Sequence, residues 1–101
     1  MKLTDKQKFK MHEYGIPERM HGGIIRYYEA GIPPGDFLTA VIDNDLKEAV
    51  NRADATNILA LKPYVVWFFN QAPYGSWGFA GATKKWVDEF AVEELKEHDD
   101  D

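Results

Sequence analysis

The chain of 101 residues contains no cysteine. That absence excludes disulfide frameworks, zinc sites built on thiolates and cysteine nucleophiles. The sequence also has no Asn-X-Ser/Thr acceptor, and its longest apolar run is the six residues from Tyr64 to Phe69. A bilayer span needs about 20 such residues, so no membrane partner is expected. The lysines before residue 11 are not followed by an apolar stretch, which speaks against a signal peptide and favours an intracellular compartment.

An excess of basic residues is also missing. The chain has 12 Lys and Arg against 17 Asp and Glu, a net charge of −5, so direct nucleic-acid binding is not expected. The acidity is local, because residues 88–101 contain eight acids and one lysine, whereas residues 1–87 contain eleven bases and nine acids. A hydrophobic fraction of 45% is sufficient for a packed core and argues against disorder.

Glycine and proline divide the chain at residues 15–17, 31–35 and 72–83. Between these breaks the apolar residues recur at helical spacing, and no alternating run indicates a strand. The pattern predicts helices over residues 4–14, 17–30, 36–53 and 54–71, and a last helix from about Thr83. The 36–53 helix is expected to be central and most buried.

Local signals predict where several of these helices begin and end. Thr4 and Asp36 are the expected N-terminal caps of the first and third helices, and Asp54 or Thr56 can start the fourth. Pro17 is the expected first residue of the second helix and Gly31 its C-terminal stop. Pro63 predicts a kink, or two short helices of which the second begins at Pro63. The fold class is therefore all-α: a small single-domain helical bundle of four to five helices over residues 1–101. Residues 1–13 are expected to be loosely held and residues 96–101 to form an acidic tail.

One candidate site lies on the predicted 36–53 helix. At 100° per residue Asp45 points into the apolar arc, and Glu48 and Arg52 lie on the same side. A carboxylate in that position needs a partner, because an unpaired buried charge is costly. The three residues are either an ion network that sets helix register or a face that binds a partner or ligand. No nucleophile or metal set accompanies them, so no catalytic residue is predicted.

The segment 72–81 combines aromatic residues with glycines. It is neither a phosphate-binding loop nor a nucleophile elbow. Tyr74, Trp77 and Phe79 either cap the core or form a partner-binding surface, since Trp and Tyr are enriched at binding hot spots. Trp77 is the better cap, because Trp86 and Phe90 follow closely, and Tyr74 and Phe79 are the better contacts.

An alternative site would bind a nucleotide or another small anion. Arg19, His21, Arg26 and Tyr27 provide cationic and aromatic groups near two glycines. The three histidines of the chain have no metal-binding spacing, so no metal and no cofactor are expected.

The linked order of four motifs resembles a group of uncharacterised small proteins encoded by tailed bacteriophages and prophages. The motifs are Gly-Ile-Pro-Pro-Gly at 31–35, Asn-Asp-Leu at 44–46, Arg-Ala-Asp at 52–54 and Trp-Gly at 77–78, within a resemblance that covers residues 14–88. The resemblance implies a phage origin and no particular mechanism. Small acidic proteins of that origin often act by binding, and no motif here combines a nucleophile, a base and a stabilising group, so we expect a non-enzymatic accessory protein in the cytoplasm of an infected bacterium. It would bind a host protein and inhibit a defence or metabolic system. Sequestration of a nucleotide or anion, and a structural or assembly role with self-association, are the alternatives.

Overall fold

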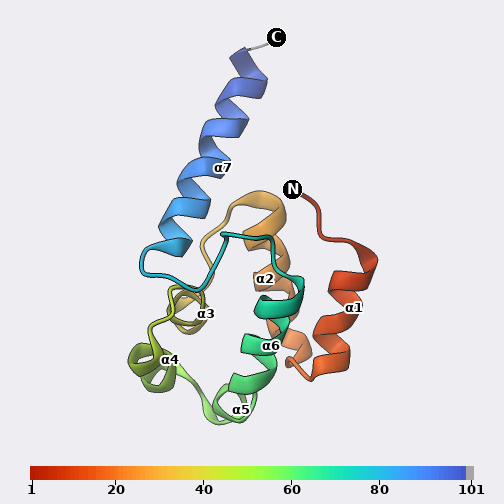
Figure 1. Cartoon of the computed structure of the whole chain (residues 1–101), viewed down its shortest axis with the longest axis vertical. Coiled ribbons are helices and arrows are strands. Elements are labelled where there is room, and N and C mark those ends of the chain that lie inside the picture. Colours follow the sequence, from red (N-terminus) through yellow and green to blue (C-terminus); the bar gives the residue numbers. More distant parts are fainter. Residues whose placement is uncertain (100–101) are drawn as a thin grey trace.

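Helices account for the regular secondary structure of the computed structural model, which describes the backbone of residues 1–99 and the side chains of residues 1–96. Seven helices follow one another in this part of the chain (Figure 1): α1 (Asp5–Tyr14), α2 (Glu18–Ala30), α3 (Asp36–Ile42), α4 (Leu46–Arg52), α5 (Ala55–Leu59), α6 (Leu61–Gln71) and α7 (Ala82–Asp99). Residues 1–99 contain no strand. The all-α prediction is confirmed, but four to five helices was too few. Most of the predicted acidic tail, residues 97–101, lies outside the described side chains.

The predicted 36–53 helix is broken at residues 43–45. Asn44 has a left-handed backbone with φ 59°, which Asn tolerates better than most residues. The Asp45 amide donates to the Ala40 carbonyl at 2.8 Å, which closes the end of α3. The Asp45 side chain then begins α4 by accepting from the Glu48 amide at 3.2 Å. Asn and Asp side chains compete with helical bonding in this way, so the pair ends one helix and begins another.

The predicted 54–71 helix is also two helices. The Asp54 side chain caps α5 by accepting from the Asn57 amide at 2.8 Å, as its sequence position predicted. The break falls at Ala60, and Pro63 is the third residue of α6, not the first. An amide in the first turn has no intrahelical acceptor, so proline costs α6 little there.

The centre of the core is aromatic and comes mainly from α2 and α6. Tyr27, Tyr28, Tyr64, Trp67 and Phe68 are all fully buried. The rings of Trp67 and Phe68 meet edge to face at a centroid distance of 5.2 Å. The segment expected to form the 36–53 helix is two helices, but it does contain the most buried residues, as predicted. Five are in α3 and one, Ala49, is in α4, compared with three each in α2 and α6.

The N-terminal segment, expected to be loose, is packed on this core. Thr4 and Gln7 form a reciprocal capping box, and Met11 is fully buried. The Trp67 indole N–H donates to the Gln7 carbonyl at 2.8 Å, which joins α6 to α1.

The last helix leaves the globule (Figure 1). Ala82 and Thr83 are buried at its base, whereas residues 91–96 are all exposed. Because α7 extends away from the globule, the molecule is 47 Å long, and its extents in the other two directions are 28 and 21 Å. Among the described helices, none is both long enough and apolar enough to cross a membrane.

Candidate functional site

The segment 72–81 connects α6 to α7. Hydrogen bonds at Ser76 attach this segment to α2. Ser76 is buried, and its hydroxyl donates to the Pro73 carbonyl at 2.7 Å. A hydroxyl has one proton, so in the 2.9 Å contact between the two hydroxyls Tyr28 donates to Ser76. The Tyr27 hydroxyl donates to the Ser76 carbonyl at 3.4 Å. Burial raises the pKa of both tyrosines well above the ordinary value, which keeps both hydroxyls protonated and able to donate.

A second attachment holds the other half of the segment. The Gly78 amide donates to the Ile42 carbonyl at the end of α3, at 2.7 Å. Gly78 has φ 88°, a left-handed backbone that glycine adopts without strain. The segment is thus tied to α2 and to α3 on either side of Trp77.

The three aromatic side chains of the segment have different environments. Trp77 is half-buried and stacks on Phe68 with ring centroids 5.5 Å apart. Its stacking partner is therefore on α6, not Trp86 or Phe90 as the sequence suggested. Tyr74 is fully exposed and Phe79 is 37% exposed. The structure thus separates a core-packed Trp77 from two solvent-facing aromatic residues, as predicted for this segment.

The structure does bring Asp45, Glu48 and Arg52 together, but at the surface. They line a shallow cleft of about 190 Å³ between α3 and α4, with Asp36 and Asp43 nearby. The Arg52 guanidinium lies 3.5 Å from an Asp36 oxygen and 3.3 Å from a Glu48 oxygen.

The burial predicted for Asp45 is wrong, because its side chain is exposed and serves as a helix cap. The angular argument assumed one continuous helix. The break at residues 43–45 changes the register, and the same change leaves Leu46 67% exposed. The carboxylates and Arg52 form an exposed ion network, which stabilises only weakly.

The four residues of the anion-binding alternative make separate contacts. The Arg19 guanidinium pairs with Asp54 at 2.6 Å. His21 Nε2 lies 2.8 Å from the Ile16 carbonyl, and because a carbonyl only accepts, Nε2 carries the proton. Arg26 lies over Gly22, where an added Cβ would be 2.9 Å from its guanidinium. Tyr27 is fully buried and faces Ser76.

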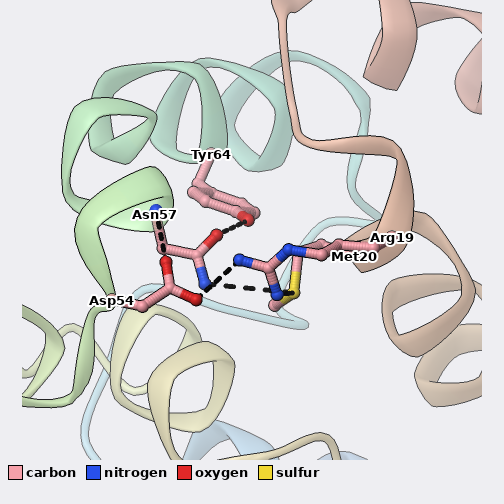
Figure 2. A network of polar contacts seen from close by, with 5 residues as sticks. All are labelled: Arg19, Met20, Asp54, Asn57 and Tyr64. Atoms are coloured by element: carbon pink, nitrogen blue, oxygen red, sulfur yellow. Dashed lines mark hydrogen bonds and ion pairs between the residues drawn. The ribbon is translucent and has the colours of Figure 1, made fainter.

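A polar network that the sequence did not predict joins α2 to α5 and α6 (Figure 2). Its centre is Asn57, a buried amide whose oxygen accepts from the Tyr64 hydroxyl at 2.6 Å. The Asn57 amide nitrogen lies 3.9 Å from the Met20 sulfur. The only signal for this residue is a single Asn among apolar neighbours, one turn after the Asp54 cap.

Two groups of the network have shifted pKa values. The Asn57 backbone amide, and then the Arg19 guanidinium, hold the pKa of Asp54 below its usual range. Burial raises the pKa of Tyr64 to about 12. The network satisfies its buried polar atoms, so its role is to join helices.

The described residues contain no group of three or more His, Asp and Glu side chains that could hold a metal ion. Comparisons with family models, curated proteins and solved structures found no match to this chain. The functional argument therefore rests on the surface of the molecule itself.

Proposed function

We propose that this chain is a non-enzymatic binding module that engages another protein through Tyr74 and Phe79. The observation that carries the proposal is a fully exposed Tyr74 on a segment held by hydrogen bonds at Ser76 and Gly78. An exposed aromatic ring on a fixed backbone loses little entropy on binding, and Tyr is among the residues that dominate interface energies.

The phage resemblance gives the biological setting of the proposal. The partner is a protein of the bacterial host, and binding in the host cytoplasm inhibits a defence or metabolic system. The exposed carboxylates of the α3–α4 cleft would favour a partner whose facing surface is basic. Anion binding has weaker support, because Arg19 is paired with Asp54 and Tyr27 is buried.

The test is capture of a stoichiometric partner from host lysate, followed by titration of the purified partner with variants. We expect Tyr74→Ala to weaken the affinity by about 30-fold, which corresponds to a hot spot of about 2 kcal/mol. Phe69→Ala is the matched control, since Phe69 is also exposed, at 77%, but lies on α6 outside the segment.

Two results would overturn the proposal. One is a captured partner whose affinity is the same for Tyr74→Ala and for the parent chain. The other is the absence of any partner together with a higher melting temperature in the presence of a nucleotide, which would favour the small-ligand alternative.

A further inference from the structure

A groove lies along α7, between this helix and Met1. Its volume is about 730 Å³ and its apolar surface comes from Met1, Trp86, Phe90 and Val92. Two of these residues, Trp86 and Phe90, are held against the globule by specific contacts. The Trp86 indole donates to the Tyr27 carbonyl at 2.8 Å, and the Phe90 ring packs on Gly31.

The rest of the groove is acidic. The other lining residues are four carboxylates, Asp88, Glu89, Glu93 and Glu94. Among residues 1–96, none of the lining side chains is basic. Lys84 pairs with Asp88 and Lys85 with Glu89, one turn toward the globule. Glu93 and Glu94 form no ion pair with any side chain of residues 1–96.

The outer part of α7 is poorly stabilised by the chain itself. Beyond Phe90 the helix has only exposed residues up to Lys96, including Val92 at 50% and Leu95 at 64% exposure. Glu89 and Glu93 lie one helical turn apart, and like charges at that spacing destabilise a helix. A short helical stretch without tertiary contacts is marginal in water. Apolar contact and positive charge are therefore the two features that an occupant must supply.

We infer that this groove docks a cationic amphipathic helix of a partner protein. Trp86 and Phe90 are four residues apart, as are Glu89 and Glu93, so α7 presents an apolar stripe beside an acidic one. A helix with leucines on one face and lysines or arginines along its edge matches both stripes, as charged flanks match in coiled coils. A second α7 does not match, because it would bring like charges together. The inference rests on the proposed role as a binding module, but it concerns a different surface from Tyr74.

The experiment titrates the full chain with a labelled synthetic peptide of about 18 residues, with leucines at helical spacing and lysines elsewhere. We expect saturable binding that weakens as NaCl is raised from about 50 to about 300 mM. Glu93→Lys should weaken it about tenfold, and Val92→Asp by a similar factor. Hydrogen exchange of the amides of residues 88–96 should slow when the peptide is bound, because the outer turns of α7 become covered.

Glu13→Lys is the matched control, since it changes the net charge equally at an exposed position on α1. We expect it and Tyr74→Ala to change peptide affinity less than twofold. Equal weakening by Glu93→Lys and Glu13→Lys would overturn the inference, because binding would then follow net charge alone. The inference would also be overturned if a peptide with glutamate in place of lysine bound equally well. A dimer of the chain that blocks the groove would overturn it as well. A normal peptide titration with failed host-protein capture would instead count against the Tyr74 surface.

Discussion

Gly31 meets two separate requirements at one position. It ends α2 with a left-handed backbone, φ 66°, and its amide donates to the Tyr27 carbonyl at 3.2 Å. A Cβ there would also lie 2.6 Å from the Phe90 ring. The sequence predicted the helix stop, but the contact with a residue 59 positions later belongs to the tertiary structure.

Three alanine substitutions separate these requirements. Gly35→Ala should change the free energy of unfolding little, since Gly35 has an ordinary φ of −66° and open space around it. Gly81→Ala should cost about 1–2 kcal/mol, because Gly81 has a positive φ but no close neighbour. Gly31→Ala should cost more than Gly81→Ala, since overpacking against Phe90 adds about 1–3 kcal/mol. Urea denaturation measures all three, and an equal loss for Gly31 and Gly81 would contradict the Phe90 contact.

The buried Tyr64 hydroxyl makes stability depend on alkaline pH. Its pKa is raised in the folded protein from the ordinary 10.0 to about 12. The contribution of the protonated Tyr64 hydroxyl to the free energy of unfolding is therefore fully present below pH 10. It is lost as the pH rises toward 12, because this hydroxyl ionises at lower pH in the unfolded chain than in the folded protein. Tyr64→Phe should make the decline between pH 10 and 12 shallower, by up to about 1.4 kcal/mol per pH unit. Chemical denaturation of the parent chain and of Tyr64→Phe across this range tests it, and equal slopes would contradict it.

At the scale of the element, the boundary between α3 and α4 depends on Asp45. Its carboxylate caps α4, and the α3–α4 break depends on Asn44 and Asp45 together. The predicted role of Asp45, a buried carboxylate, and its observed role, a helix cap, tolerate different substitutions. A buried ion pair needs the charge, whereas a cap needs only a hydrogen-bond acceptor.

Asp45→Ala should therefore cost about 1 kcal/mol, and Asp45→Asn should cost almost nothing, since Asn caps helices as well as Asp. Thermal or urea denaturation of the two variants decides the matter. If Asn is as damaging as Ala, the charge of Asp45 matters and its role is more than that of a cap.

On the scale of the whole molecule, the segment 72–81 holds separate helices together. Ser76 bonds to α2, Trp77 stacks on α6 and Gly78 bonds to the end of α3. The Thr83 amide then donates to the Asp43 carboxylate at 2.8 Å, which fixes the base of α7 beside α3. Since a domain of this size unfolds cooperatively, loss of one of these contacts weakens the entire fold.

Trp77→Ala should accordingly destabilise the whole chain by about 2–4 kcal/mol, less than a fully buried Trp because the side chain is only half-buried. For a domain of this length that lowers the melting temperature by about 10 °C or more. Tyr74→Ala should leave the melting temperature within about 1 °C, since the ring has no buried surface to lose. Equal melting temperatures for the two variants would contradict the separation of a core residue from a contact residue.

The sequence by itself determined the helical class and several helix boundaries. Thr4, Asp54 and Gly31 lie where their patterns predicted, because a cap is a bond between residues three or four positions apart. Local chemistry was sufficient for each of these boundaries. The sequence also favoured Trp77 over Tyr74 and Phe79 as the ring that packs on the core, but for the wrong reason, since Trp77 stacks on Phe68 of α6.

Only the tertiary structure decided which faces of the helices are buried. Asn44 and Ala60 end helices at points that apolar spacing alone did not reveal, and the break at Asn44 moved Asp45 from the predicted core to the surface. The contacts that fix this arrangement join residues far apart in the chain, such as Gly78 with Ile42 and Thr83 with Asp43. The groove on α7 arises in the same way, since Met1 and Phe90 meet only after the chain has folded. Spacing within one helix contains no information about such partners, because their energies depend on packing between helices.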